Sequence, residues 1–254
     1  MPPGTANGLL YEGPSLSGVR WAQTRRHEGP SPGPYGGFNL APHVGEDTAD
    51  TAENWRRLRR LCGVGRAEVA TCRQVHGTRI LRVDRGGHHH QEADALFSLS
   101  PGLYVGVFTA DCVPVLYAAG GRGVAAAHCG WRGAAEGLAG ETLAVLAKAA
   151  RVPVTAIDVW LAPSIRQCSY EVGAEFRDRF AAAHLRPRIG GKYELDVAGV
   201  VTADLLDAGA AAHRIRVSTV DTFSDPTCYS YRREGSPAGR MLSFVGLADG
   251  TGLG

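Results

Sequence analysis

The chain has 254 residues, of which 44% are hydrophobic and 20% charged, with 27 basic against 25 acidic side chains. This composition is ordinary for a globular protein and excludes an intrinsically disordered one, which has fewer apolar residues and a larger net charge. The near balance of charge argues against a protein that binds nucleic acid or a membrane surface. No apolar run reaches the roughly 18 residues of a membrane-spanning helix, and the N-terminus lacks the basic and apolar regions of a signal peptide. We therefore expect a cytoplasmic protein.

The first half of the chain predicts one helix and then a series of strands. Residues 29–37 form a loop rich in glycine and proline. Residues 38–41 form a turn that we expect to lie beside the functional site. Trp55, Leu58 and Leu61 recur at helical spacing, which predicts a helix over residues 48–62 that Gly63 ends. Short apolar runs predict strands at residues 68–72, 79–83, 104–109, 113–118 and 123–127.

Beyond residue 130 the pattern predicts further helices and two strands. The helices are marked in turn by apolar residues at 138, 143 and 146, at 172, 176 and 180, and at 200, 201 and 205, with Asp196 as the N-cap of the last. The strands are predicted at residues 157–161 and 216–220. Helices and strands mix without strict alternation. We therefore expect an α+β fold, with mixed β-sheets packed in layers and helices on the outside in an α/β/β/α-like sandwich, as a single domain over residues 1–254.

Three segments place a histidine or cysteine where core residues are otherwise expected. His76 directly follows a strand, Cys112 lies between two apolar strands, and His128 lies at a strand-to-helix turn. Two imidazoles and one thiolate suit zinc, which with three protein ligands keeps a fourth position open for water, as in catalytic sites. The spacings of 36 and 16 residues match no local zinc-finger pattern. Residue chemistry alone therefore leaves a second interpretation open, in which two hydrogen-bonded core histidines and a buried thiol carry no metal.

Six segments, in order and over almost the whole chain, resemble the polyphenol-oxidase or laccase-domain family, whose members were reassigned as purine nucleoside phosphorylases with adenosine deaminase activity. The segments are GGFNL (36–40), QVHG (74–77), ADAL (93–96), TADCVP (109–114), HCGWRG (128–133) and SYRR (230–233). The resemblance implies a mixed-sheet sandwich, one zinc ion held by His76, Cys112 and His128, and purine nucleosides and phosphate as substrates. The chain departs from the family at Cys129, where alanine is usual, and at residues 221–222, where Asp-Thr stands for a frequent Cys-Thr pair.

Phosphorolysis requires an anion pocket, for which three arginines are candidates. Arg132 lies at the start of a predicted helix, where free backbone N–H groups favour anions. Arg232 and Arg233 are adjacent, and a guanidinium group binds phosphate in a forked geometry. A surface or structural salt bridge is the alternative role for each.

Deamination and substrate recognition require further polar groups. Asp111 is a candidate proton shuttle because it precedes Cys112, although adjacent strand residues point to opposite faces of a sheet and a structural carboxylate is the alternative. Asn39 and Gln74 are candidates for binding the ribose hydroxyls or the base edge. The sequence indicates neither the preferred nucleoside nor the oligomeric state.

Three other functions remain open at this point. Two histidines and a cysteine also form the equatorial ligands of a copper centre, but a multicopper oxidase needs several His-x-His pairs, and the one here lies within residues 88–90, which we interpret as an exposed loop. Cys112 would alternatively be the nucleophile of a cysteine hydrolase, with His128 or His76 as its base. A nucleoside-sensing or partner-binding module with a structural zinc is the third, non-enzymatic function.

Overall fold

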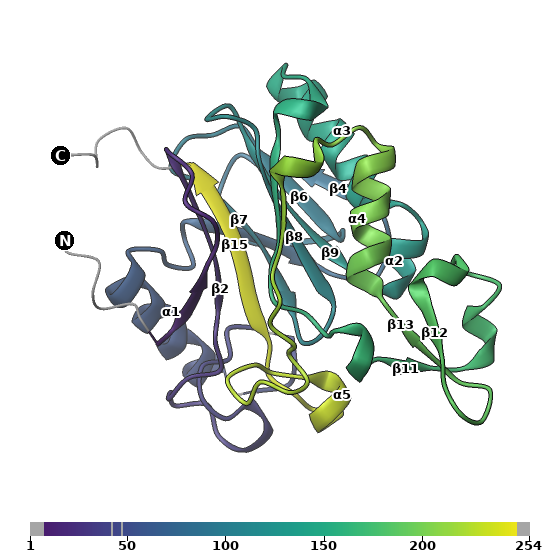
Figure 1. The fold of residues 1–254 in the computed structure, drawn as a ribbon. Coiled ribbons are helices and arrows are strands. Elements are labelled where there is room, and N and C mark those ends of the chain that lie inside the picture. Colours follow the sequence, from purple (N-terminus) through teal and green to yellow (C-terminus); the bar gives the residue numbers. More distant parts are fainter. Residues whose placement is uncertain (1–7, 42, 47, 248–254) are drawn as a thin grey trace.

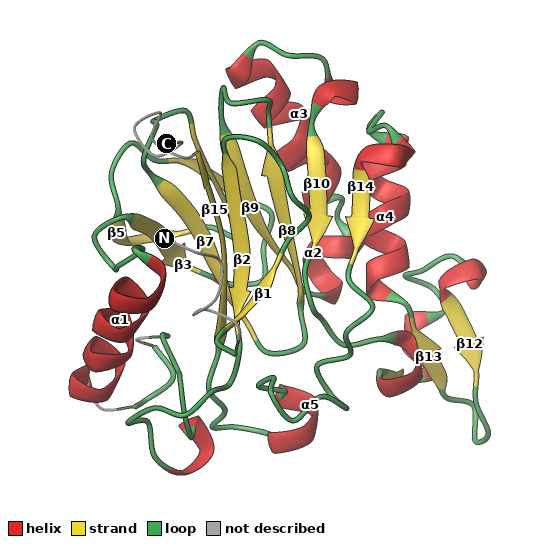
Figure 2. Ribbon diagram, turned by 60° about the vertical axis from the view of Figure 1, so that its left-hand side comes forward, coloured by secondary structure: helices red, strands yellow, loops and turns green. Residues whose placement is uncertain are grey.

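Two six-stranded sheets lie face to face, and each is covered on its outer side by helices (Figure 1). The computed structural model describes residues 8–41, 43–46 and 48–247. Helix α1 (Thr48–Cys62) covers one sheet, and α2 (Trp131–Ala135), α3 (Leu138–Ala150) and α4 (Val197–Asp207) lie at the other (Figure 2). The short helix α5 (Tyr231–Glu234) lies in the long connection that leads to the last strand of the chain. The expected layered sandwich is therefore confirmed.

The first sheet joins strands from both ends of the chain. Its order is β1 (Leu10–Glu12), β2 (Val19–Thr24), β15 (Met241–Leu247), β7 (Tyr104–Thr109), β3 (Val69–Arg73) and β5 (Gly87–Glu92). Strand β15 pairs antiparallel with both β2 and β7, whereas β3 pairs parallel with β7 and β5. Because β15 is central, the C-terminal segment completes this sheet.

The second sheet has two fully buried strands at its centre. Its order is β14 (Ile215–Val217), β10 (Asp158–Leu161), β8 (Val113–Ala118), β9 (Val124–Cys129), β6 (Ala95–Ser98) and β4 (Ile80–Arg82). Every residue of β8 and β9 is buried, as expected for strands covered on both faces, which appear as continuous apolar runs.

A three-stranded sheet and several single helical turns complete the fold. The small sheet has the order β11 (Glu171–Val172), β13 (Tyr193–Leu195) and β12 (Leu185–Pro187). The 3-10 helices lie at Gly33–Tyr35, Val154–Ala156, Gln167–Ser169, Ala174–Phe176, Ala182–His184 and Ala212–Arg214.

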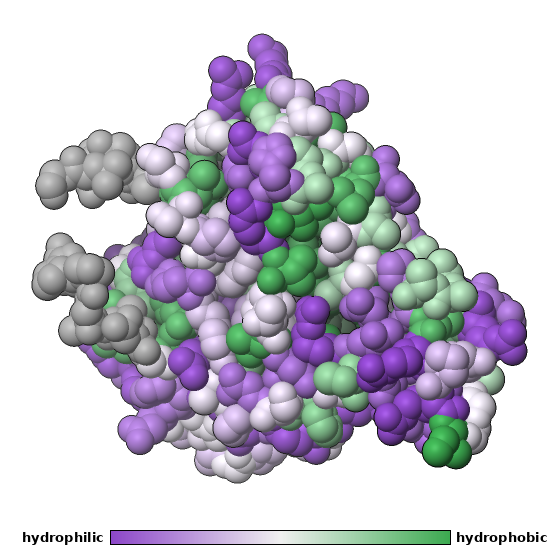
Figure 3. All heavy atoms as spheres, viewed as in Figure 1, coloured by the Kyte–Doolittle hydropathy of each residue, from purple (hydrophilic) through white to green (hydrophobic). Residues whose placement is uncertain are grey.

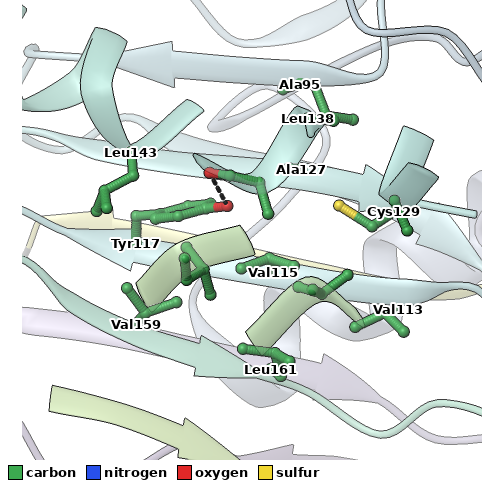
Figure 4. Close-up of a cluster of buried hydrophobic side chains, with 14 of the residues drawn as sticks. Ala95, Val113, Val115, Tyr117, Ala127, Cys129, Leu138, Leu143, Val159 and Leu161 are labelled. Atoms are coloured by element: carbon green, nitrogen blue, oxygen red, sulfur yellow. Dashed lines mark hydrogen bonds between the residues drawn. The ribbon is translucent and has the colours of Figure 1, made fainter. Parts of the chain in front are cut away.

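The hydrophobic core follows from strand alternation. Along β8, Val113, Val115 and Tyr117 point toward α3 and α4, whereas Leu116 packs into the space between the two sheets. Figure 4 shows the first of these layers, in which the Tyr117 hydroxyl donates to the Ala139 carbonyl at 3.0 Å. This hydrogen bond satisfies the only polar atom of a fully buried side chain. The candidate site lies where β3, β7 and β9 end and β8 begins. The core therefore holds the strands that carry the site.

Several elements differ from the sequence-based expectation. The helix predicted around Phe176 is only a 3-10 turn, because Val172 pairs in β11 and Phe176 stacks on Phe180 at 5.9 Å. The expected helix after residue 133 is broken into α2 and α3 at Gly137, which has a positive φ of 75°. Residues 88–90 form part of strand β5 and not a loop. Strands β2, β6 and β15 are further elements that the sequence analysis did not predict.

The surface of the face shown in Figure 3 is mixed, with hydrophilic residues around the small sheet and an apolar area near α4. No helix among the described residues is long and apolar enough to cross a membrane.

Candidate metal centre and active-site cavity

The structure brings His76, Cys112 and His128 together. One ligand atom from each lies within 4.8 Å of the other two, and the two imidazole rings are 4.8 Å apart at 75°. His76 lies in the loop after β3, Cys112 in the turn between β7 and β8, and His128 near the end of β9. We call these three residues the metal group.

Asp94 holds the metal group in place from behind. Its buried carboxylate accepts hydrogen bonds from His128 Nδ1 at 2.8 Å and from the backbone N–H groups of Val75, His76 and Gly77 at 2.7–3.1 Å. Burial alone would raise the pKa of Asp94, but the hydrogen bonds from His128 and the backbone lower it. Because Nδ1 of His128 donates to Asp94, Nε2 keeps its lone pair for a metal ion.

The same network stabilises a backbone conformation that is unusual for a histidine. His76 has a positive φ of 61°, which costs a non-glycine residue free energy and is often found at functional sites. Its N–H donates to Asp94 Oδ1 at 2.9 Å. Asp94 therefore orients one ligand through its ring and another through its backbone.

Electrostatics also favour a ligand-competent thiol. Burial opposes ionisation of Cys112, yet the charge of His128 and hydrogen bonds from His128 and His76 lower its pKa to about 6. Conversely, burial would lower the pKa of His128, but Cys112 and Asp94 raise it to about 9. The thiolate is the form that binds metals. A metal cation that binds Cys112 and His128 would therefore take the place of the proton on the His128 ring.

The residues present fit a divalent ion of borderline softness. Imidazole and thiolate are the usual ligands of zinc and are also compatible with copper. A Cβ at position 130 would come 3.0 Å from His76 Cδ2 and 3.3 Å from Cys112 Sγ, so Gly130 lets the backbone pass this close to the ligands. Cys129 does not join them, because it packs in the core against α3 and burial raises the pKa of its thiol.

A cavity of about 680 Å³ opens in front of the metal group. This volume lies in the usual range for small-molecule sites. Asp111 and Cys112 both line it, because they lie in a turn and not in a strand, so the expected placement on opposite faces is wrong. Asp111 has a positive φ of 94°.

The carboxylate of Asp111 accepts three hydrogen bonds from the segment over residues 222–232. It receives hydrogen bonds from Thr222 Oγ1 at 2.7 Å, from Ser230 Oγ at 3.1 Å and from the Arg232 backbone N–H at 2.6 Å. Burial raises its pKa, although these three donors oppose the shift. Asp111 therefore anchors the beginning of α5 to the cavity wall.

Three arginines line the cavity, and two of the sequence-predicted residues are among them. Arg132, Arg232 and Arg240 take part in no ion pair among the described residues. The guanidinium of Arg132 lies 4.3 Å from the ring centre of Trp131, and that of Arg232 lies 5.0 Å from that of Tyr170. We call these three arginines the arginine group. Positive charge without a carboxylate partner is available for an anion.

Arg233 lies outside this group although it follows Arg232 directly. Its guanidinium donates to the backbone carbonyls of Thr222, Phe223, Asp225 and Cys228 and contacts Glu234. It does not line the cavity. Arg233 therefore ties the loop over residues 222–228 to α5.

Of the two candidate substrate-binding amides, Gln74 lines the cavity and Asn39 does not. Asn39 is buried, does not line the cavity, and accepts from the Arg240 backbone N–H at 2.9 Å. Gln74 lines the cavity, but its amide exchanges two 2.8 Å hydrogen bonds with the backbone of Phe108. Asn39 thus supports Arg240 from behind, and Gln74 joins the loop before His76 to the end of β7.

Sequence reasoning missed Asp94, Arg240 and His43. Asp94 is part of the ADAL motif, but its role depends on hydrogen bonds from the backbone of residues 75–77, which the motif does not reveal. His43 lines the cavity with an exposed side chain, and partial desolvation together with the charge of Arg240 lowers its pKa, which favours the neutral imidazole. Neither His43 nor Arg240 lies in a motif, and no local pattern pointed to them.

Comparison with known proteins identifies the family of the chain. A family model described as multi-copper polyphenol oxidoreductase laccase matches residues 20–248. The chain belongs to this family. Among curated members, it is 36% identical to a purine nucleoside phosphorylase of Pseudomonas aeruginosa, over 95% of this chain and 98% of that protein. It is 33% identical to the purine nucleoside phosphorylase YfiH of Escherichia coli, over 94% of this chain and 98% of the relative.

Solved structures of the family share the same fold. YlmD of Geobacillus stearothermophilus superposes with a TM-score of 0.85 at 29% identity, covering 93% of this chain and 94% of YlmD. The hypothetical protein YfiH of Bacillus licheniformis gives a TM-score of 0.88 at 24% identity, over 94% and 97% of the two chains. The family resemblance seen in the sequence motifs is thereby confirmed.

Proposed function

We propose that this protein is a zinc-dependent purine nucleoside phosphorylase that also deaminates adenosine, with purine nucleosides and phosphate as substrates. The observation that carries the proposal is that the arginine group and the metal group line one cavity. An anion site beside a metal site matches a reaction between phosphate and a neutral nucleoside. The names of the family's curated members support the same activity.

The arginine group would bind and orient the phosphate. Guanidinium groups contact phosphate oxygens in a forked, charge-assisted geometry. In phosphorolysis a phosphate oxygen bonds to the anomeric carbon of the ribose while the bond to the base nitrogen breaks, and the departing base takes up a proton. Arg240 is the best-placed residue to hold phosphate, because cavity walls desolvate its guanidinium and lower its pKa. A desolvated charge attracts an anion more strongly than one screened by water.

The metal group would serve the base and the deamination reaction. When bound, a zinc ion would supply a Lewis acid that activates water for attack on the purine carbon bearing the amino group. Neutral His43 has a ring nitrogen available to accept a proton from a substrate or water at the cavity wall. Asp111 already accepts three hydrogen bonds, two of them from Ser230 and the Arg232 backbone at the beginning of α5, which favours a positioning role over proton transfer. We therefore propose that Asp111 positions Arg232 and also lines the cavity beside Cys112.

The surroundings of the site favour zinc over copper. A blue-copper centre adds a weak axial ligand, usually a methionine, to two histidines and a cysteine. Met241, the methionine within the described residues, is buried in a cluster with Tyr229 and Cys228, with its sulfur 3.5 Å from the amide nitrogen of Gln23. The second methionine, Met1, lies outside the described residues.

The deciding experiment is a panel of adenosine, inosine, guanosine and methylthioadenosine, each incubated with and without phosphate. Zinc-loaded wild type should release free base only with phosphate, and should convert adenosine to inosine without it. Cys112→Ala, with its zinc content measured, should lose both reactions together with the metal. Zinc-loaded wild type that forms neither free base nor inosine would refute the proposal.

One observation supports a second candidate, a cysteine hydrolase. Asp94, His128 and the Cys112 thiolate form a chain of the kind that activates nucleophilic cysteines. In that case the purified enzyme would be active without metal, and alkylation of Cys112 would abolish its activity. Activity that follows zinc content and resists alkylation in the zinc-loaded form would exclude this candidate.

A further inference from the structure

Strand β5 lies at the edge of the first sheet (Figure 2) and carries three successive histidines, His88, His89 and His90. Within the strand, His88 pairs with Thr71 of β3 and His89 pairs with Cys72. The register with β3 shifts after His89, where Arg73 next pairs with Glu92. Side-chain alternation up to that point and the proximity of the two rings place His88 and His90 on one face and His89 on the other. The imidazole rings of His88 and His90 are 5.3 Å apart at 90°. The sequence run of three histidines is thus divided by the strand into a pair and a single residue.

The hydrogen bond of His88 leaves it with a ring nitrogen that suits a metal on the face that it shares with His90. His88 Nδ1 lies 3.1 Å from Thr71 Oγ1, and donation from Nδ1 leaves the lone pair on Nε2. This resembles the outer-shell hydrogen bond that orients histidine ligands in metal sites. In contrast, His89 Nε2 lies 3.0 Å from the carbonyl oxygen of Arg85. Since a carbonyl only accepts, His89 must donate there, and its remaining lone pair on Nδ1 belongs to a side chain on the opposite face of the strand from His88 and His90.

We propose that His88 and His90 form a second metal site, which binds one divalent transition ion such as Cu²⁺, Ni²⁺ or Zn²⁺ through two imidazole nitrogens. Two imidazoles that share one ion at bonds of about 2.0–2.1 Å have ring centres roughly 4.5–5.3 Å apart, which agrees with the observed separation. The histidines border an open surface hollow, so water completes the coordination. This site is independent of the proposed function.

The surroundings also determine which ions the site prefers. The hollow is lined by Arg85 and the histidine run, without a carboxylate among its described lining residues. Hard ions such as Mg²⁺ and Ca²⁺ require oxygen ligands and are excluded, whereas neutral imidazoles suit Cu²⁺ and Zn²⁺. For such nitrogen ligands, Cu²⁺ binds more tightly than Ni²⁺ or Zn²⁺.

The test is a Cu²⁺ titration of the full-length zinc-loaded protein, followed by calorimetry and electron paramagnetic resonance. Wild type should bind one more ion per chain than His90→Ala, with a spectrum split by two nitrogen nuclei. His90→Ala should weaken this binding by more than about tenfold, since even the loss of an outer-shell partner costs about 10- to 100-fold. All variants keep the metal group, so any Cu²⁺ that replaces zinc there adds equally to every titration and does not affect the difference between wild type and variant.

His89→Ala is the matched control, and Thr71→Val tests the orienting contact. His89→Ala should bind the extra ion like wild type, and Thr71→Val should bind it more weakly than wild type. Either of two results would overturn the proposal: no additional ion in wild type relative to His90→Ala, or equal loss of binding in His89→Ala and His90→Ala. His90 is exposed, so its substitution leaves the fold intact.

Discussion

The metal group and the arginine group line one cavity but are built in contrasting ways. The metal group comes from strand ends near the middle of the two sheets, and its charges compensate one another within the network Asp94–His128–Cys112. The arginine group comes from α2, α5 and the loop before β15, and no ion pair among the described residues neutralises it. The side chains of the metal group are held by hydrogen bonds to one another and to Asp94, whereas the arginine group presents positive charge without a carboxylate partner.

This difference indicates how the two parts divide the chemistry. Rigid ligands held by an outer-shell carboxylate preserve the geometry that a metal ion requires. The guanidinium groups of Arg232 and Arg240 donate to backbone carbonyls but have no ion-pair partner among the described residues. They gain a charged partner when an anion binds, so this part of their stabilising effect appears in the complex. Substitutions in the metal group should therefore abolish turnover, whereas those in the arginine group should change the response to phosphate.

The largest effect is expected for Cys112→Ala. Removal of a direct ligand should lower zinc affinity by more than about 100-fold, because outer-shell losses alone cost about 10- to 100-fold. Both phosphorolysis and deamination should fall with the zinc content, as measured by chelator competition and by the nucleoside panel. Persistent phosphorolysis in a metal-free variant would separate the reaction from the metal group.

The next largest effect is expected for Asp94→Asn. The amide lacks the charge that orients His128 and stabilises the loop at His76, so zinc affinity should fall by about 10- to 100-fold. Asp158→Asn is the control, since it removes a carboxylate that pairs with Arg214 at the surface. That pair should contribute less than about 1 kcal/mol to stability. Similar zinc affinity in both variants would show that Asp94 has only a structural role.

An intermediate effect is expected for Arg240→Met and Arg232→Ala. Loss of a charge-assisted contact of about 1.5–3 kcal/mol should raise the KM for phosphate by roughly 10- to 100-fold. Deamination, which uses no phosphate, should change less than phosphorolysis in both variants. The measurement is the KM for phosphate and the rate of inosine formation, compared with wild type.

Arg233→Met is the matched control for these two arginines. It should lower the melting temperature, because four backbone carbonyls lose a donor, and leave the KM for phosphate near the wild-type value. A rise in KM equal to that of Arg232→Ala would place Arg233 in the phosphate site. Equal loss of both reactions in Arg232→Ala would argue against a phosphate role for Arg232.

The smallest effect is expected for Arg132→Ala. This arginine is exposed, so water and salt screen its charge. We expect the KM for phosphate to rise by only about two- to fivefold, and the difference from wild type to shrink at about 1 M salt, where the Debye length is about 3 Å. An effect that is independent of salt would indicate a direct buried contact.

Local sequence patterns predicted the elements whose burial follows a simple period. The helix of α1 has the bounds that its apolar spacing and Gly63 indicated, and strands β7 and β8 also match. The helix expected around Phe176 was wrong because the same spacing fits a single turn whose phenyl rings stack. Side-chain spacing reports which residues pack together, but it does not distinguish an extended helix from one turn within a small sheet.

In the sequence, the metal group is two histidines and a cysteine near the ends of predicted strands. The sequence by itself determined those residue types and their order, because ligand chemistry belongs to single side chains. Only the tertiary structure decided which carboxylate orients them, that Arg232 faces the cavity while Arg233 binds carbonyls, and that Arg240 joins from the far end of the chain. Those choices depend on contacts that the fold makes between separate elements, from His128 with Asp94, 34 positions apart, to the Arg232 N–H with Asp111, 121 positions apart, which no local period encodes.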